Sequence, residues 1–506
     1  PYEIESYSGS LEKDGIVKFT TKANCYNPKV LCNYITSSPA AFYATVMTGM
    51  TPNRHGIVGS RFHSTADNSE INCMEDPRYE GINTKETVSP RLLQARTIAD
   101  NLKIAYPNSK VYSIATTAES AIMMGGHLAN GAVWFNQDSA MWCTSNFYDN
   151  GLPTWATDRR EINKHLGEPW KPMRAISTYR FQARSKNTWN KEEPVFGQIA
   201  GGKELVNSPL INEVITRMAI KAIRSELLGT DESPDMLMIE YTLKTPYLGT
   251  EKCAETEDAM MRLDQEFREL TDAIDLSVGL NNTVIIVTGT PARSTEKAEN
   301  ISKKLPRMTF NSERAMALLN AYLMAIYGQG RWVERYKDGQ VYLNHQLIDN
   351  QNISYKEIEE KTAQFLTEFS TVLTATATNG LNVLATGNGG YLDRLANTIY
   401  KHRSGDVVVT LLPGVTEEGK NETINFQCTL VVTSEKDSPV LSGIMDVIGQ
   451  FRVSVRSMNV RDLESQGVSE ISVRILVPSR AASVRKTGSI MYSYMVNFPF
   501  SQIFSS

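Results

Sequence analysis

Histidine is scarce in this sequence. The chain of 506 residues contains six histidines, which is few for an enzyme of this size. They are His55, His63, His127, His165, His345 and His402. The six cysteines include no Cys-x-x-Cys pair, so a zinc site built on thiolates is not expected. Lys and Arg number 52 and Asp and Glu 56, so the net charge of −4 gives no electrostatic basis for nucleic-acid binding.

Long apolar runs are also missing from the sequence. No stretch of about 18 apolar residues occurs, so we expect no transmembrane segment. The chain opens at Pro1 without an initiator methionine or an apolar leader, and we expect any export signal to have been removed. Hydrophobic residues make up 41% of the chain and charged residues 21%. It can therefore bury a large core, which excludes a disordered protein and a small disulfide-stapled fold.

Short apolar runs alternate with an amphipathic pattern along the chain. The runs typical of buried strands are Val111–Thr117, Asp235–Leu243, Thr283–Thr288 and Asp406–Leu412. Between the second and third runs, apolar residues spaced by three and four predict a helix over Thr256–Leu276. This rhythm predicts an α/β protein with a mostly parallel central sheet and helices on both faces. Such a sheet has its ligand site at the carboxyl ends of the strands.

The sequence predicts two domains. Residues 1–415 form the α/β domain, with an irregular cap or insertion at about 140–205. The predicted hairpin and further helices of this domain are Glu334–Asn344, Tyr355–Phe369 and Gly390–His402. Residues 416–506 form a small α+β module and tail. Its predicted elements are a strand at Phe426–Ser434, a helix at Val440–Phe451, and two strands at Arg452–Val460 and Val468–Val477. This order resembles the first part of an ACT-type, ferredoxin-like domain. The module could therefore serve either as a packing module or as a binding site for an effector.

Four segments carry a second resemblance. They are Thr48–Ile57 (TGMTPNRHGI), Gly126–Phe135 (GHLANGAVWF), Thr144–Tyr148 (TSNFY) and Arg403–Val407 (RSGDV). In sequence and order they resemble motifs of the alkaline phosphatase superfamily. Within it, the resemblance is to the type I phosphodiesterase/nucleotide pyrophosphatase branch, close to the single-Thr bacterial alkaline phosphatases. The resemblance implies an alkaline-phosphatase-like α/β fold. It also implies a two-zinc site at which a threonine alkoxide attacks phosphorus.

The positions that carry this chemistry are altered here. The nucleophile position falls on Pro39, which has no hydroxyl, and Ser38 or Ser37 could serve only if the turn shifts. The mapped metal-ligand positions are Pro246, Thr250, Thr290 and Pro291, and no histidine follows Asp406. The first Asp ligand would lie on a strand preceding the segment near Gly9–Lys13. Hydroxyls and prolines are poor zinc ligands beside carboxylate and imidazole.

The phosphate-contacting positions are altered in the same way. The family's cationic segment aligns with Thr117–Ser120, so Glu119 stands where a phosphoryl group needs a positive charge. The position of the family's phosphate-contacting Asn is occupied by Ser60. His55 and His127 belong to the structural segments. We therefore expect these positions to be vestigial, with no catalytic residue, no metal and no cofactor.

The main hypothesis is a pseudoenzyme that acts as a binding or scaffold subunit of a larger assembly. We expect protein partners, no nucleic acid, and export in bacteria to the periplasm or the cell surface. One alternative is an active phosphatase or phosphodiesterase with a site rebuilt around Ser38 or Ser37. Another is a binder of a neutral polar ligand in the old pocket, lined by Thr117, Tyr247, Thr250 and Thr290.

Overall fold

The computed structural model divides the chain into two compact units, Pro1–Glu417 and Glu418–Ser506, which are described separately. The structure describes residues 2–18, 32–35, 38–64, 69–184, 194–243, 252–289, 308–381, 389–412, 415–417, 426–435, 454–463 and 468–477. Within these ranges, no helix is long and apolar enough to cross a membrane.

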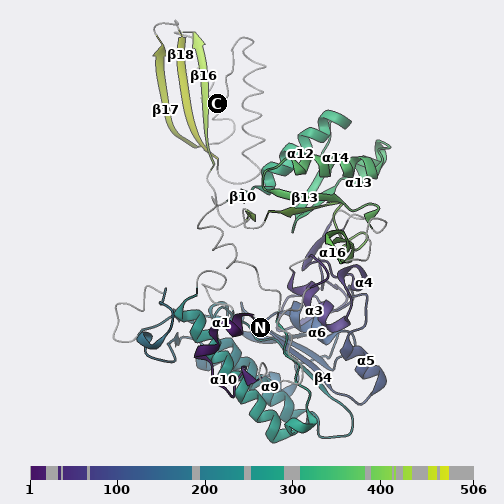
Figure 1. Ribbon diagram of the computed structural model, residues 1–506, viewed down its shortest axis with the longest axis vertical. Helices are drawn as coiled ribbons and strands as arrows, with labels where there is room; N and C mark the ends of the chain where they lie inside the picture. The colour runs from purple at the N-terminus through teal and green to yellow at the C-terminus, as the bar shows by residue number, and fades with distance from the viewer. Residues whose placement is uncertain are drawn as a thin grey trace. The chain divides into compact units, whose positions relative to one another are not determined.

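The first unit contains a five-stranded sheet (Figure 1). Its order is β3-β6-β5-β4-β9, with bounds Gly81–Ile82, Met141–Ser145, Gly131–Asn136, Val111–Ala115 and Met236–Ile239. β4 runs parallel to β5 and β9, whereas β6 is antiparallel to β5 and β3. The strands predicted at Val111–Thr117 and Asp235–Leu243 are thus confirmed as β4 and β9, and both are shorter than predicted.

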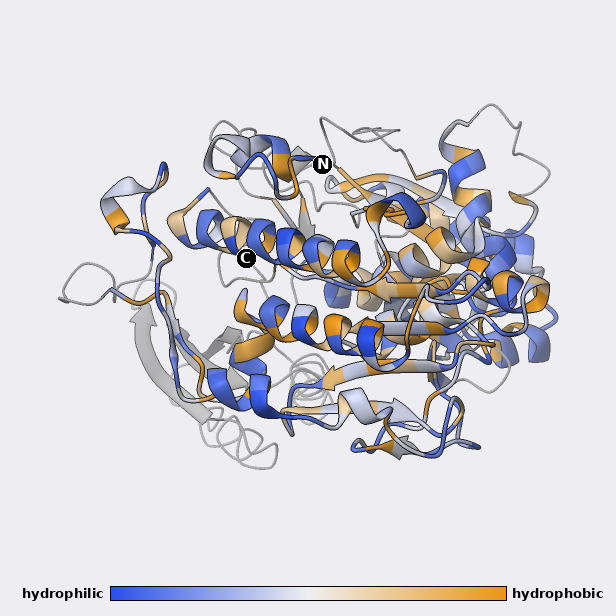
Figure 2. Ribbon diagram, turned by 90° about the horizontal axis from the view of Figure 1, so that it is seen from below, coloured by the Kyte–Doolittle hydropathy of each residue, from blue (hydrophilic) through white to orange (hydrophobic). Residues whose placement is uncertain are grey.

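Helices cover both faces of this sheet, as predicted. α9 (Leu210–Ser225) and α10 (Ala254–Ser277) pack on the face that includes Ile114, whereas α3 (Pro39–Thr48) and α6 (Ala118–Gly125) pack on the opposite face. Successive residues of β4 and β5 join different core clusters because side chains alternate across a strand. α10 confirms the helix predicted from apolar spacing. Figure 2 shows hydrophobic and hydrophilic residues alternating around the long helices.

Buried acids of α10 anchor segments that have little regular structure of their own. Asp264 accepts the backbone N–H groups of Glu12 and Ile16, at 2.8 and 2.6 Å. Asp258 accepts the indole N–H of Trp170 at 2.7 Å and the hydroxyl of Tyr179 at 2.5 Å. These bonds satisfy carboxylates that would be costly to bury unpaired. They tie the N-terminal segment and the cap to one helix.

A second, four-stranded antiparallel sheet has the order β11-β12-β14-β13. The strand bounds are Val333–Lys337, Gln340–Leu343, Val407–Leu411 and Val372–Ala377. Asp338 and Gly339 join β11 to β12 with φ of 48° and 76°, which confirms the predicted hairpin and its tight turn. The strand predicted at Asp406–Leu412 exists as β14. It lies in this sheet and not beside β9, because β12 and β13 occupy both of its edges.

The remaining elements are short or cover these sheets. Beside the second sheet lie α12 (Ser312–Tyr327), α13 (His345–Asn350), α14 (Tyr355–Thr367) and α16 (Tyr391–Thr398). The N-terminal half also contains α1 (Tyr2–Tyr7), η1 (Ser8–Ser10), α4 (Pro52–His55), β1 (Arg61–Ser64), β2 (Ser69–Asn72) and α5 (Ile98–Ala105). The cap region contains η2 (Thr154–Ala156), α7 (Arg160–His165), β7 (Pro169–Trp170), η3 (Ile176–Thr178), β8 (Gly197–Gln198) and α8 (Gly202–Val206). The other short elements are η4 (Leu280–Asn282), β10 (Thr309–Phe310) and β15 (Thr416–Glu417).

The prediction of a strand at Thr283–Thr288 is wrong. These residues belong to no strand, and the side chains of Val284 and Ile286 are 87% and 80% exposed. A strand needs a neighbour to complete its hydrogen-bond ladder. Among the described residues, β9 pairs with β4 alone and residues 283–289 have no ladder partner. An apolar composition was therefore not sufficient to make this run a strand.

The second unit contains three described strands. β16 (Phe426–Glu435), β17 (Ser454–Leu463) and β18 (Val468–Val477) form an antiparallel sheet in the order β16-β18-β17. The helix predicted at Val440–Phe451 lies outside the described residues.

One buried acid in the first unit gives a testable pH dependence. Glu359 of α14 is 3% exposed and accepts the backbone N–H of Asn379 at 2.9 Å. Burial raises the pKa of Glu359 to about 7, and the charge of Asp406 raises it further against the effect of that N–H. Because the folded pKa lies above the unfolded one, the stabilisation is complete below about pH 4.5 and is lost as the pH rises through about 7.

We expect Glu359→Gln to be more stable than the natural chain above pH 7, by about 1–3 kcal/mol. The two proteins should differ little at about pH 5, because Glu359 is then protonated. Urea denaturation at both pH values measures this difference. The exposed neighbour Glu360 provides the matched control, Glu360→Gln. Equal pH dependence in all three proteins would contradict the assignment.

Candidate functional site

One carboxylate, that of Glu240, joins the elements at the carboxyl ends of β4 and β9. Its Oε1 accepts the hydroxyls of Tyr43 at 2.6 Å and Ser120 at 2.7 Å. Its Oε2 accepts the backbone N–H and the hydroxyl of Thr116, at 2.9 and 2.7 Å. These donors come from α3, from α6 and from the residue following β4. Glu240 therefore fixes the two helices against the ends of the strands.

Glu240 is the site residue that sequence reasoning missed. It lies within the apolar run DMLMIEYTL, whose composition predicts only a strand. An acidic residue in a run of that composition is costly to bury unless donors surround it, and this was the available signal. Burial, followed by the Glu240 charge, raises the pKa of the Tyr43 phenol well above its ordinary value. Tyr43 therefore stays protonated and continues to donate.

The structure brings together three of the sequence-predicted site residues: Ser38, Ser60 and Glu119. The Oγ atoms of Ser38 and Ser60 lie 3.2 Å apart. Ser60 donates its hydroxyl proton to Oε1 of Glu119 at 2.9 Å. Because that proton is committed to Glu119, Ser60 can only accept from Ser38. The hydrogen bonds therefore run in one direction, from Ser38 to Ser60 to Glu119.

Local sequence explains why Ser38 lies where it does. Ser38 is the N-cap of α3, with φ −66° and ψ 130°, and Pro39 occupies the first turn, where its missing N–H costs nothing. The Ser38 side chain makes no capping hydrogen bond. Its hydroxyl faces Ser60 instead. Pro39 thus has a structural role at the position where the family pattern implies a nucleophile.

Thr117 belongs to the neighbouring helix start. It is the N-cap of α6 and accepts the backbone N–H of Ser120 at 3.2 Å. Its Oγ1 lies 2.9 Å from the Ser120 hydroxyl, which donates to Glu240. Thr117 is therefore linked to the Glu240 cluster through Ser120. The other predicted positions, Ser37, Pro246, Tyr247, Thr250, Thr290 and Pro291, lie outside the described residues.

The motif histidines have structural contacts. Ile57 donates its backbone N–H to Nδ1 of His55 at 3.1 Å, so Nε2 carries the proton and lies 3.0 Å from Oγ1 of Thr45. Burial lowers the pKa of His55 to about 4, which keeps it neutral near pH 7. His127 lies 3.1 Å from both a carboxylate oxygen of Asp100 and the carbonyl of Leu93. Both rings hold loops in place.

Arg403 of the RSGDV segment is also structural. Its Nη1 donates to the carbonyls of Gly56 and Leu92, each at 2.7 Å. The guanidinium also lies over the rings of Phe62 and Tyr400, at 5.3 and 4.9 Å from their centroids. The cation of this motif is thus used to bind backbone carbonyls of two distant loops.

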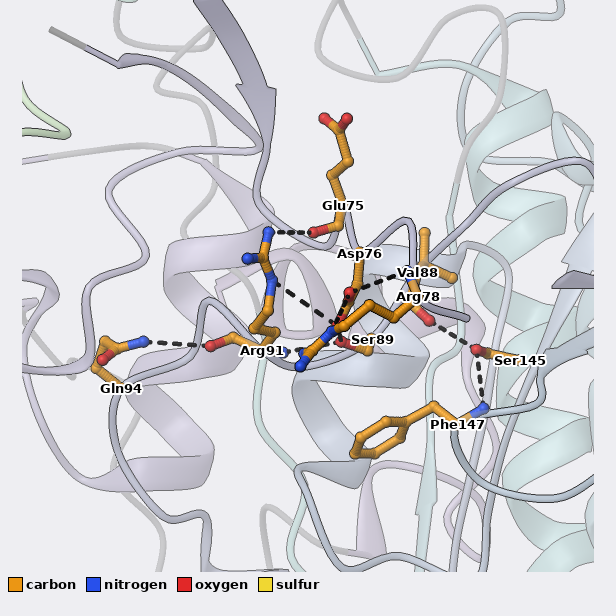
Figure 3. A network of polar contacts seen from close by, with 9 residues as sticks. All are labelled: Glu75, Asp76, Arg78, Val88, Ser89, Arg91, Gln94, Ser145 and Phe147. Carbon is orange, nitrogen blue, oxygen red and sulfur yellow. Dashed lines mark hydrogen bonds and ion pairs between the residues drawn. The ribbon is translucent and has the colours of Figure 1, made fainter. Parts of the chain in front are cut away.

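A polar network next to these loops involves the TSNFY segment (Figure 3). Asp76 is 1% exposed and accepts from Nε of Arg78 at 2.9 Å and from the Ser89 hydroxyl at 2.6 Å. The hydrogen bond from Arg78 lowers the pKa of Asp76 far below its ordinary value, against the opposing effect of burial. Ser145 donates to the carbonyl of Val88 at 2.6 Å, which attaches the same loop to β6.

The described side chains that meet here do not supply the ligands of the two-zinc site that the resemblance implies. Within the described ranges, no group of three or more His, Cys, Asp or Glu side chains is placed to hold a metal ion. The cluster offers the hydroxyls of Ser38 and Ser60 and the carboxylates of Glu119 and Glu240, both of which already accept hydrogen bonds. Proline and threonine at the mapped ligand positions add no carboxylate or imidazole.

Known proteins resemble the chain over most of its length. A model of the family described as type I phosphodiesterase / nucleotide pyrophosphatase matches residues 21–429. Similar proteins include a calcium-transporting ATPase from Myroides odoratus (26% identical), the alkaline phosphatase PhoV from Synechococcus elongatus (24%) and the alkaline phosphatase PafA from Elizabethkingia meningoseptica (22%). These matches cover 65%, 76% and 65% of this chain, and 64%, 73% and 64% of the relatives' own lengths.

The fold also matches a solved structure. The crystal structure of wild-type PafA superposes with a TM-score of 0.70 at 21% identity, covering 81% of this chain and 82% of that one. The fold and the motif segments together define a protein of the alkaline phosphatase superfamily. Within it, the chain belongs to the type I phosphodiesterase/nucleotide pyrophosphatase family.

The Glu240 cluster predicts a strong effect of mutation. Glu240→Ala leaves the donors of Tyr43, Thr116 and Ser120 without their acceptor, and we expect a loss of about 2–5 kcal/mol in the free energy of unfolding. Glu240→Gln keeps one acceptor oxygen and should lose less. Urea denaturation gives both values. The exposed Glu232 serves as the control, because Glu232→Ala should change stability by no more than about 0.5 kcal/mol. Equal effects at the two positions would contradict this role for Glu240.

Proposed function

We propose that this chain has lost phosphoryl transfer and acts by binding, as a subunit or accessory factor of a larger assembly. The observation that carries the proposal is the hydrogen bond from Ser60 to Glu119 beside Ser38. It places a carboxylate next to the start of α3, where the family pattern implies phosphate-binding groups. Pro39, at the mapped nucleophile position, cannot form an alkoxide.

Electrostatics support this proposal. A phosphate monoester carries close to two negative charges at neutral pH, and a carboxylate within hydrogen-bonding range repels it. Glu240 adds a second carboxylate through its contact with Ser120, the residue after Glu119. The motif residues His55, His127 and Arg403, by contrast, bind backbone and side-chain groups of the fold. The proposed protein therefore keeps the fold of the family but has different groups at the phosphate-binding position.

The proposed partners are proteins, and the proposed location is outside the bacterial cytoplasm. A larger assembly is expected to show as a mass above the 56.4 kDa of the chain when the native protein is purified without denaturant. Identification of what co-purifies would name the partner.

A second candidate is favoured by the direction of the hydrogen bonds at Ser38. A hydroxyl that donates toward a carboxylate through one intermediate has a route for its proton, which suits a nucleophile. In this reading the chain is a hydrolase with a site rebuilt around Ser38. The third hypothesis, a binder of neutral polar ligands, uses the same hydroxyls together with Thr117, and three of its proposed contacts lie outside the described residues.

Phosphoester turnover and metal content test the main proposal together. We expect the purified chain to hydrolyse p-nitrophenyl phosphate and bis-p-nitrophenyl phosphate no faster than its Ser38→Ala variant, with or without added zinc. We also expect less than stoichiometric zinc and manganese by elemental analysis, because the mapped ligands are absent. Stoichiometric metal would contradict the proposal. Turnover that disappears in Ser38→Ala would establish the rebuilt hydrolase in its place.

A further inference from the structure

We propose that the loops joined by Arg403 form a docking surface for an acidic segment of a partner protein. This inference rests on the proposed binding role and adds the chemistry of the partner. The surface, which we call the basic face, consists of five exposed cations: Arg54, Arg91, Arg96, Arg394 and Lys401. Three observations carry it: the lack of acids in the segments concerned, the contacts that bring these segments together, and the lack of acidic partners for the cations.

Three stretches of the sequence contain no Asp or Glu. They are residues 15–66, 87–99 and 394–405. The chain as a whole carries a net charge of −4, so these stretches differ from the rest of it. Acids at the ends of the stretches are buried and accept backbone N–H groups of the fold; they are Asp100, Asp393 and Asp406. They therefore present little negative charge to a partner.

Arg403 brings the three stretches together. Its Nη1 donates to the carbonyls of Gly56 and Leu92, each at 2.7 Å. The backbone N–H of Gln94 also donates to the carbonyl of His55 at 2.9 Å. The loops that begin α4, precede α5 and follow α16 are thus neighbours, although they are far apart in the sequence.

The cations of the basic face lie on either side of these contacts. Three of them are one or two residues from a residue that takes part in the contacts of Arg403: Arg54, Arg91 and Lys401. Neighbouring Cα atoms are about 3.8 Å apart, so these three backbones lie within about 8 Å of such a residue. Arg96 follows Gln94 by two residues. α16, which contains Arg394, packs against α4 (Figure 1).

Most cations of the basic face lack an acidic partner. Among the residues that the structure describes, no salt bridge is formed by Arg54, Arg96, Arg394 or Lys401. The exposed Arg160, in contrast, pairs with Asp158 at 2.8 Å. A partner that brings carboxylates to the basic face would therefore not have to displace acids of this chain.

Arg91 also adds positive charge that is only partly compensated. It shares the carboxylate of Asp76 with Arg78, at nitrogen–oxygen distances of 3.7 and 2.8 Å respectively. The Glu75 carboxylate points away from both arginines (Figure 3). Burial lowers the pKa of Arg403, and the charge of Arg91 lowers it further. The two guanidinium groups are thus close enough to repel each other.

The composition of the basic face favours a protein over other polyanions. Four of its five cations are arginines, and a planar guanidinium binds a carboxylate through two parallel hydrogen bonds. The side chains of Met50 and Leu392, on the same segments, are 42% and 36% exposed. Arg and Met are enriched in protein interfaces, and a phosphate backbone offers no apolar contact. An acidic segment with a few apolar residues therefore complements this face.

Binding of an acidic peptide to the full chain tests the proposal. The probe is a fluorescein-labelled peptide of Asp and Glu that contains two leucines, followed by fluorescence anisotropy. We expect binding that weakens as salt is added. We also expect an affinity at least about tenfold lower in the charge-reversal variant Arg54→Glu/Arg394→Glu/Lys401→Glu. The milder variant Arg54→Ala/Arg394→Ala/Lys401→Ala should lose less affinity and keep the thermal unfolding of the natural chain.

The matched control is Lys85→Glu/Lys203→Glu/Arg224→Glu. It reverses three exposed cations on other segments and changes the net charge of the chain by the same amount. It should bind the peptide as the natural chain does.

Three results would overturn the proposal. One is the absence of peptide binding to the natural chain at low salt, and another is an equal loss of affinity in the control variant. The third is tighter binding to phosphatidylglycerol vesicles or to an oligo-dT strand than to the peptide, which would assign the face to a lipid surface or to nucleic acid.

Failure of this inference is distinguishable from failure of the proposed function, which is tested on phosphoester turnover and metal content. Turnover together with peptide binding at the basic face would refute the proposed function and keep the surface. No turnover and no peptide binding would refute the surface alone.

Discussion

The carboxylate of Glu240 is the interaction on which the site depends. It lies just after β9 and collects donors from α3, from α6 and from the end of β4. Ser38 begins α3, and Glu119 precedes the Ser120 that Glu240 holds. The positions of Ser38 and Glu119 are thus set by helices that Glu240 fixes, and Ser60 lies between them. Its four hydrogen bonds also explain how a charged residue is accommodated at the end of an apolar strand.

Polar contacts in and beside the motif segments hold distant loops of the fold together. Arg403 joins the loops at Gly56 and Leu92, His127 joins Asp100 to the carbonyl of Leu93, and Asp76 gathers its arginine and serine donors. These residues lie in or beside the segments that make the chain recognisable as a superfamily member. The scaffold can therefore persist while the residues that meet at Ser38 change.

The sequence predicted much of the fold and part of the site. Buried strands at β4 and β9 and the amphipathic α10 follow from composition and period, and the hairpin follows from Asp338-Gly339. The run at Thr283–Thr288 has the same composition as a buried strand, but composition does not say whether a neighbour is present to complete the ladder.

For the site as well, the sequence does not say which residues become neighbours in space. Mapping by resemblance located Ser38, Ser60 and Glu119, which are far apart in sequence and meet in the fold. It could not locate Glu240, because its importance comes from donors on three other elements. The direction of the hydrogen bonds at Ser38 likewise depends on which atoms meet in space.

Under the proposed function, the groups around Ser38 disfavour a phosphoryl anion. Binding of inorganic phosphate and of vanadate, measured by calorimetry on the natural chain and on Glu119→Gln, tests it most directly. We expect no detectable binding to the natural chain at millimolar anion, and a gain in binding when the Glu119 charge is removed. Micromolar binding to the natural chain that weakens in Glu119→Gln would contradict it.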